Sequence, residues 1–426
     1  MMKRIMKNAS VRNAGWLIFG KAGQMAISLI VGLITARYLG PSNYGLIHYA
    51  SAYSVFFMAF CTLGINSVLV KEFIDHPQEE GEIIGSALAL RAVSSCLSAG
   101  VIVGLVCILD AGERTTIVVT ALSSLSLIFA IFETFNYWFQ ARLESRVTAM
   151  AMLAAYALTS AYKVILLIGR KGVEWFAFSA SLDYIMTAAL QLHSYKRHGG
   201  RRLSFSLKTS RRLLGRSVHF ILPGMMTAVY GYTDKLMLKQ MLGETQVGYY
   251  ATATAICGMW SFVLMAVIDS MHPTIIAARE KDYSLYEKRN RQLYAAVLYL
   301  AAFVSAVFFI FGEEMILVLY GEAYLPAAAP LKVATWYTAF SYLGVARNAW
   351  MVCEDKQRCL KYIYAGAAAC NVVLNALLIP PFGTTGAAAA SLATQILIAI
   401  VLPFALKDLR RNSVLMMEAA ILKGLR

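Results

Sequence analysis

The sequence predicts an all-α, polytopic membrane protein with twelve transmembrane helices in two six-helix lobes. Three observations lead to this fold class. Hydrophobic residues make up 59% of the 426 positions and charged residues only 15%, where a soluble globular protein has about 25%. The apolar residues form twelve segments long enough to cross a bilayer, and one basic loop separates the first six from the last six. This pattern excludes a disordered chain, a disulfide-stapled secreted scaffold and an ordinary cytosolic enzyme.

The twelve apolar segments are expected to be helices, because backbone polar groups in hydrocarbon must be hydrogen-bonded within the protein, and the alternation typical of barrel strands is absent. The first six segments cover residues 14–36, 46–70, 83–109, 115–138, 147–168 and 173–193. The last six cover residues 217–241, 248–273, 292–312, 327–352, 361–379 and 385–406. The expected organisation is an N-terminal lobe over 1–195, a basic linker over 196–216, a C-terminal lobe over 217–406 and a tail over 407–426.

The lysine and arginine residues predict the orientation in the membrane. With the N-terminus in the cytoplasm, 28 of the 39 fall on the cytoplasmic side, five in the outer loops and six within spans. This asymmetry follows the positive-inside rule, so both termini are expected in the cytoplasm. The linker carries eight of these cations and no acid, and it is expected to lie near anionic lipid headgroups. Membrane orientation thus explains the net charge of +15, and we expect no nucleic-acid partner.

A short motif occurs at the same place in both halves of the chain. LGPSNYG over residues 39–45 returns as LGETQVG over residues 242–248, with an offset of 203 between the paired glycines. Because six spans separate the copies, both halves cross with the same polarity, which predicts a parallel repeat with its pseudo-twofold axis along the membrane normal. Two such lobes can rock around a central cleft, as alternating access requires. The glycines also suit tight turns, and the two roles are compatible.

Three segments and one buried acid carry a resemblance to a known family. ARYLGPSNYGL over residues 36–46 resembles the first-loop signature of bacterial polysaccharide exporters of the O-antigen flippase (Wzx) type. NVVLNALLIPPFGTTGAAAAS over residues 371–391 is similar to the eleventh-to-twelfth span of that family. LYGEAYLPAAAPLKV over residues 319–333 also fits, as does Asp234 within the seventh span. The family belongs to the multidrug/oligosaccharidyl-lipid/polysaccharide exporter superfamily, whose lipid II flippases typically have two more spans.

The resemblance implies a transporter and not an enzyme. Its cargo would be an undecaprenyl-diphosphate-linked oligosaccharide, flipped by alternating access from the inner to the outer leaflet of the bacterial inner membrane for surface polysaccharide such as O-antigen. The implied partners are this lipid-linked glycan and membrane lipids, with the polysaccharide polymerase and chain-length proteins as further candidates and H⁺ or Na⁺ as the coupling ion. No cofactor is implied. The alternative is a multidrug-type small-molecule exporter of the same superfamily.

Ionisable and polar residues within the spans are the candidate site residues, because a charge at mid-membrane costs at least about 2.5–3.5 kcal/mol and is a functional candidate by default. Helical spacing places them on polar stripes, which predicts a water-filled cleft lined by protein. The residues proposed to line this cavity are Lys21, Gln24, Arg91, Lys163, Tyr230 and Asp234.

These side chains match the cargo that the resemblance implies. Lysine and arginine would offset the charge of a diphosphate headgroup through charge-assisted hydrogen bonds, and hydroxyl, amide and aromatic groups would bind the sugars. Asp234, Glu133 and Asp183 are candidates for counter-ions or for coupling to protons or sodium. In the competing interpretation, such acid–base pairs only hold helices together. Arg347 and Lys332 lie near span ends, where we expect them to snorkel to the interface.

Other chemistries find little support in the sequence. The seven cysteines form no CxxC pair and no zinc-binding spacing, and neither HExxH nor a nucleophile elbow is present. Residues 15–22 match GxxxxGK but carry Ala where Ser or Thr would bind magnesium. A membrane polymerase or ligase would need a sizeable outer loop, and the outer loops are short. GxxxG motifs at residues 81–85 and 100–104 predict close helix packing.

Overall fold

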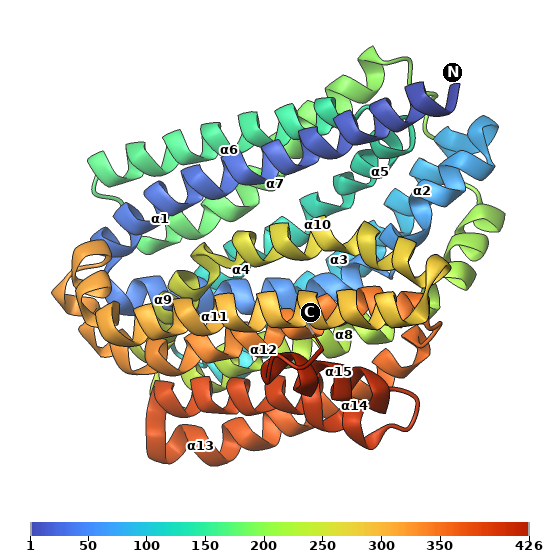
Figure 1. Ribbon diagram of the computed structural model, residues 1–426. Helices are drawn as coiled ribbons and strands as arrows, with labels where there is room; N and C mark the ends of the chain where they lie inside the picture. Colours follow the sequence, from blue (N-terminus) through green and yellow to red (C-terminus); the bar gives the residue numbers. More distant parts are fainter. Residues whose placement is uncertain (1, 425–426) are drawn as a thin grey trace. The chain divides into compact units, whose positions relative to one another are not determined.

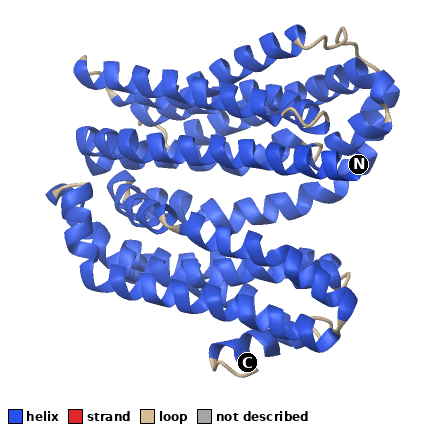
Figure 2. Ribbon diagram, turned by 45° about the horizontal axis from the view of Figure 1, so that its top comes forward, coloured by secondary structure: helices blue, strands red, loops and turns tan. Residues whose placement is uncertain are grey.

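The computed structural model describes residues 2–424, with side chains from residue 15 onward except at residues 17 and 18. This described part is 90% helical and contains no strand (Figure 2), which confirms the all-α class. The α-helices are α1 (Met2–Thr62), α2 (Asn66–Asp75), α3 (Glu80–Leu109), α4 (Arg114–Phe129), α5 (Thr134–Ala141), α6 (Ser145–Ile168), α7 (Val173–Arg197), α8 (Leu207–Leu242), α9 (Glu244–Met259), α10 (Ser261–Lys281), α11 (Tyr283–Leu319), α12 (Ala328–Cys353), α13 (Leu360–Ile396), α14 (Leu402–Ala405) and α15 (Arg410–Ala420). The shorter helical segments are η1 (Pro77–Glu79), η2 (Ala130–Glu133), η3 (Glu322–Ala327), η4 (Gln357–Cys359) and the π-helix η5 (Leu397–Val401).

The long apolar helices make this chain a multi-pass membrane protein. Among the described residues, seven helical stretches are long and apolar enough to cross a membrane. All twelve expected segments fall mainly on helix, and α1 and α13 each carry two of them. Gly40 in α1 and Gly383 in α13 have positive φ, so the backbone changes direction there and separates the two spans. The fold therefore has the twelve spanning segments that the apolar pattern predicts.

The chain divides into two compact units. The first comprises the residues up to Leu39 together with Leu46–Ala228, and the second comprises Gly40–Gly45 together with the chain from Val229 onward. In the first unit, α7 packs against α4 and α6, and α3 packs against α4. Gly20 and Gly23 bring α1 close to α6, and Figure 1 shows these two helices side by side. In the second unit, α12 packs against both α11 and α13, and α15 lies against α11.

The sequence repeat reappears in the backbone. Gly40 and Gly243, which are 203 residues apart, have φ of 70° and 90° and the same ψ of 171°. The helices α3 and α11 begin at Glu80 and Tyr283, which differ by the same offset. Both halves therefore place a glycine-dependent break and a long helix at matching positions, as the repeat predicts.

The two copies of the motif meet inside the second unit. A Cβ atom built on Gly45 would collide with the carbonyl oxygen of Glu244, and one built on Gly248 would collide with that of Pro41. These two contacts are equivalent, because adding 203 converts Pro41 and Gly45 into Glu244 and Gly248. Close backbone approach, in addition to tight turns, is thus the physical reason for the repeated glycines.

The GxxxG motif at residues 81–85 packs against the linker. A Cβ atom on Gly81 or Gly85 would collide with the backbone carbonyls of Arg202 and Ser204, and the Ser204 amide donates to the Gly81 carbonyl at 3.2 Å. The prediction for residues 100–104 is wrong for the described chain, because no heavy atom lies within 4 Å of a Cβ built on either glycine.

Acidic side chains of α2 and η1 neutralise part of the linker charge. Arg212 Nε lies 3.2 Å from Glu72 Oε2, its Nη2 lies 2.7 Å from Glu79 Oε2, and Arg216 also pairs with Glu72. The hydrogen bond with Glu79 is the main reason that the pKa of Arg212 is raised above its ordinary value. These cations therefore hold the beginning of α8 to α2 and η1 within the first unit, in addition to the expected attraction to lipid headgroups.

Candidate functional site

Asp234 in α8 is the most buried of the three predicted acids, with 4% of its surface exposed. Its Oδ2 accepts hydrogen bonds from the Tyr250 hydroxyl in α9 and, at 3.3 Å, from Ser391 Oγ in α13. Its Oδ1 accepts from the Lys235 amide at 2.8 Å. Three helices of the second unit thus converge on one carboxylate, which can hold a proton or contact a small cation. Sequence reasoning missed Tyr250 and Ser391, although Tyr250 lies two residues after the repeated motif.

A ladder of buried amides runs along α13 beside Ser391. Asn375 Nδ2 donates to Asn371 Oδ1 at 3.0 Å, and Asn371 Nδ2 donates to Thr394 Oγ1 at 3.3 Å. Both asparagines have no exposed surface, and Asn375 Oδ1 accepts no hydrogen bond from the described residues. The repeating Asn-x3-Asn spacing, visible in the sequence, places them one helical turn apart.

Arg91 and Glu133, both predicted site residues, lie together in the first unit. Arg91 has no exposed surface. Its Nη1 donates to Thr134 Oγ1 at 3.0 Å and to Asn66 Oδ1 at 3.3 Å, while its Nη2 donates to the Ala130 carbonyl at 2.9 Å. Glu133 Oε2 lies 3.8 Å from Nη2. Arg91 therefore ties α3 to α2, η2 and α5 through both terminal nitrogens, and only its Nε donates to no acceptor of the described residues.

Lys163 and Asp183 form a second acid–base group of the first unit. They lie on the packed helices α6 and α7, close enough for a favourable charge interaction, and both are half-buried. Asp183 Oδ1 is buried and accepts no hydrogen bond from the described residues. This pair is less tightly held than Arg91 and Glu133, so both groups retain capacity for a ligand.

Lys21 and Gln24 lie on α1 beside the two glycines that contact α6. Gly20 and Gly23 face Ala149 and Leu153 of α6, whereas Lys21 is exposed and Gln24 is half-buried. Within the described chain, neither side chain has a hydrogen-bond or ion-pair partner. Lys21 is thus a cation within an expected span whose ammonium group is open to a ligand.

Tyr230 lines a small pocket within the second unit. The cavity measures about 70 Å³, and its polar lining comes from Tyr230, Ser341, Arg347, Asn348, Tyr364 and Gln395. The rings of Tyr230 and Tyr364 are stacked, with centroids 6.0 Å apart. The expectation that Arg347 snorkels to the interface is wrong, because its side chain is 1% exposed. Its neighbours come from α8, α13 and η5, so no local sequence pattern could reveal them.

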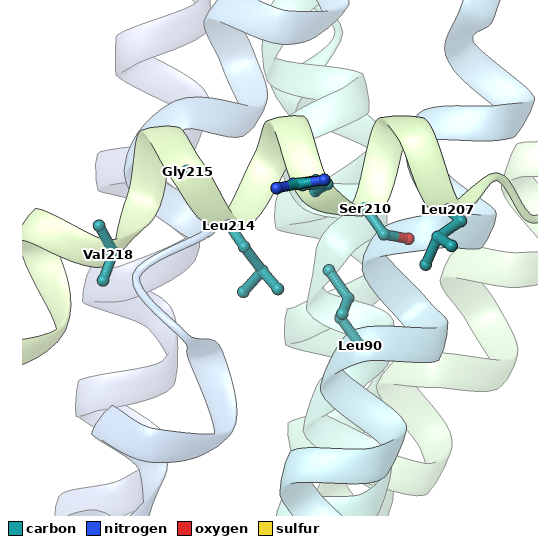
Figure 3. A pocket seen from close by; sticks show the side chains of 7 residues that line it. Leu90, Leu207, Ser210, Leu214, Gly215 and Val218 are labelled. Atoms are coloured by element: carbon teal, nitrogen blue, oxygen red, sulfur yellow. The ribbon is translucent and has the colours of Figure 1, made fainter.

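A larger groove of about 630 Å³ lies on the first unit between α3 and the beginning of α8. Figure 3 shows Leu90 and Leu214 pointing into it from the two helices. The lining is aliphatic apart from Ser210 and Arg211, so the groove can accept an apolar chain with a negative group at its edge.

The predicted site residues thus fall into separate groups. The structure brings Arg91 to Glu133 and Lys163 to Asp183 in the first unit, and it surrounds Asp234 with hydroxyl donors in the second. Among the described residues, no group of three His, Cys, Asp or Glu side chains could hold a metal ion.

Comparison with known proteins gives a family match. The family described as "Polysaccharide biosynthesis protein" matches residues 10–278, which is more than half of the chain. An uncharacterised membrane protein of Methanocaldococcus jannaschii is 22% identical over 226 residues, which cover 50% of this chain and 44% of that protein. The match therefore spans less than half the length of this curated relative.

Solved membrane transporters share the fold. The lipid II flippase MurJ in an inward closed conformation has a TM-score of 0.73 at 11% identity, and the superposition covers 97% of this chain and 92% of the MurJ chain. An inward-facing multidrug resistance MATE family transporter has a TM-score of 0.67 at 13% identity, and the superposition covers 93% of this chain and 96% of the transporter chain. A MOP superfamily transporter from Pyrococcus furiosus has a TM-score of 0.65 at 13% identity, and the superposition covers 97% of this chain and 96% of that transporter. At these identities, the likeness establishes the shared fold.

Proposed function

This chain belongs to the polysaccharide biosynthesis protein family, and from that premise we propose that this MOP-superfamily transporter flips an undecaprenyl-diphosphate-linked oligosaccharide. Transport runs from the inner to the outer leaflet of the bacterial inner membrane, with both termini in the cytoplasm, and it supplies surface polysaccharide assembly such as that of O-antigen. The polysaccharide polymerase and chain-length proteins are the proposed downstream partners.

Positive charge within the spanning segments supports this cargo most directly. A diphosphate headgroup must cross a region where an unpaired charge is costly, and lysine or arginine lowers that cost by charge-assisted hydrogen bonding. Lys21 is open to a ligand, and among the described residues Lys163 has a favourable charge interaction with Asp183 but no ion-pair or hydrogen-bond contact. We assign part of the headgroup contact to these two lysines, with Gln24 as a sugar contact in the first unit and Tyr230 as a separate polar contact with the cargo in the second.

Arg91 has a different place in this proposal. Its guanidinium is engaged by Asn66, Thr134 and the Ala130 carbonyl, so it acts on the cargo through the helices that it holds. Glu133 stays beside it as a counter-ion. Arg91 is therefore a positioning residue of the cavity.

Asp234 is the proposed coupling group. A buried carboxylate that accepts from Tyr250, Ser391 and a backbone amide can exchange a proton or a sodium ion while the donors reorient. Loading of this site would favour one of two conformations, as alternating access requires. Asp183, which has one unsatisfied oxygen, is the second candidate.

The test uses the full chain in a bacterium whose own polysaccharide flippase gene has been deleted. The expected result is restored surface polysaccharide and loss of the lipid-linked units stranded on the inner leaflet. Lys21→Ala should reduce this rescue at equal membrane expression, and Lys196→Ala, an exposed linker cation, should leave it unchanged. Drug efflux without any effect on the glycan would instead establish the multidrug-type alternative.

A further inference from the structure

Arg347 is a buried cation with no acidic partner among the described residues. It lies in α12, and only 1% of its surface is exposed. Burying a guanidinium is costly, so buried arginines are normally paired with a carboxylate. Within the described chain no carboxylate pairs with Arg347, and Tyr230 and Tyr364 line the pocket beside it. Its Nε is buried and donates to no acceptor of the described residues.

One of its donors has a clear structural purpose. In the π-helix Leu397–Val401, the amide of Leu402 bonds to the carbonyl of Leu397, five residues earlier. The same register would pair the Ile398 carbonyl with residue 403, which is Pro403 and has no N–H. Arg347 Nη1 supplies the missing donor at 2.9 Å. This bond fixes one edge of the guanidinium and leaves the remaining N–H groups for another acceptor.

The pocket beside Arg347 has the size and polarity for one small anionic group. Its volume is about 70 Å³, several times the roughly 10–15 Å³ that one water needs, so a group of a few heavy atoms fits. Asn348, Gln395 and Ser341 add amide and hydroxyl donors to the charge of Arg347. Asn348 is exposed, and it marks the side from which a ligand can enter.

We propose that the Arg347 pocket binds a single oxyanion group, a phosphate or carboxylate carried by the lipid-linked cargo. This assignment rests on the proposed function, because the cargo supplies the anion. The guanidinium forms charge-assisted hydrogen bonds to the oxyanion, the amides of Asn348 and Gln395 complete the donor set, and the stacked pair Tyr230 and Tyr364 forms a flat wall. The π-helix then contributes to the site, because its Ile398 carbonyl orients the Arg347 guanidinium.

The test measures binding by the purified full chain in nanodiscs, with undecaprenyl diphosphate, uncharged undecaprenol and inorganic phosphate as separate probes. Undecaprenyl diphosphate should bind saturably and undecaprenol much more weakly. Arg347→Gln, which keeps a donor for the Ile398 carbonyl, should weaken diphosphate binding at least about tenfold, as expected on loss of a buried charge contact. Arg358→Gln removes an exposed arginine as the matched control and should bind as the wild type does.

A second variant tests the same pocket in case Arg347→Gln does not fold. Asn348→Leu removes an amide at an exposed position, and it should weaken diphosphate binding while the protein elutes and melts as the wild type does. Competition by inorganic phosphate, lost in Arg347→Gln, would show that the phosphate group itself is recognised. Failure to compete, with diphosphate binding still dependent on Arg347, would assign recognition to the lipid-linked form.

Wild-type binding and transport in both variants would overturn the inference and leave the proposed function standing. Failure of the wild-type chain to flip the glycolipid, with Arg347-dependent binding of inorganic phosphate, would overturn the proposed function and the cargo assignment together, leaving a site for free anion. The two failures are therefore distinguishable.

Discussion

The repeated glycines allow a prediction whose sign and size come from the structure. A Cβ atom on Gly45 would lie 2.6 Å from the Gly248 nitrogen and 2.9 Å from the Glu244 carbonyl carbon. Non-bonded carbon atoms prefer about 3.5–4.0 Å, so the two backbone segments would have to separate by roughly 1 Å. That shift would also stretch the 3.1 Å hydrogen bond from Ser42 Oγ to Glu244. Gly45→Ala is therefore expected to destabilise the protein by about 2 kcal/mol, within the usual range for overpacking.

Gly248→Ala should have a similar effect, since its Cβ would lie 2.9 Å from the Pro41 carbonyl carbon and 3.2 Å from the Pro41 Cα. A loss of about 2 kcal/mol corresponds to a melting temperature lower by roughly 4–8 °C for a unit of this size. The measurement is the melting temperature of the detergent-purified protein, followed by size-exclusion chromatography after heating.

Gly104→Ala is the matched control, because this glycine lies inside α3 with no heavy atom of the described chain within 4 Å of the added Cβ. Alanine is the better helix former there, so the control should be stabilised by about 0.5–1 kcal/mol. A melting temperature of Gly45→Ala equal to or above that of Gly104→Ala would refute the argument that the motif glycines are required for backbone contact.

Three further predictions concern buried charges. Arg91→Ala leaves Glu133 and several acceptors unpaired, so it should lower stability by about 3–5 kcal/mol and reduce the yield of folded protein. Lys21→Ala is the control and should melt like the wild type. Equal stability of the two variants would contradict the assignment of Arg91 to helix packing. Asp234→Asn should fold, but it should transport at least about tenfold more slowly and without dependence on pH or sodium. The measurement is glycolipid flipping in proteoliposomes. An unchanged ion dependence would exclude Asp234 as the coupling group. Glu72→Ala removes the carboxylate shared by Arg212 and Arg216, while Arg212 keeps its bond to Glu79, and the loss should cost about 1.5–3 kcal/mol. A wild-type melting temperature would show that other contacts hold the linker.

The sequence indicates most of the fold because the membrane restricts the choices. Apolar segments of about 20 residues must form helices, and their count, the basic linker and the glycine motif are all local features. The offset of 203 also predicted where the backbone breaks recur, at Gly40 and Gly243. The motif at residues 100–104 shows the limit of local patterns, because a GxxxG face forms a contact only if another backbone reaches it.

The candidate site depended on contacts that no local pattern contains. Arg91 and Arg347 look alike in the sequence, each a lone arginine among apolar residues. The fold surrounds Arg91 with acceptors from Asn66 and Thr134 and a nearby carboxylate, whereas it places Arg347 beside a π-helix carbonyl and a polar pocket. The sequence by itself determined which residues carry charge into the membrane, because hydropathy is a property of the chain. Only the tertiary structure decided which of those charges are satisfied, because their partners come from helices distant in sequence and are fixed by packing.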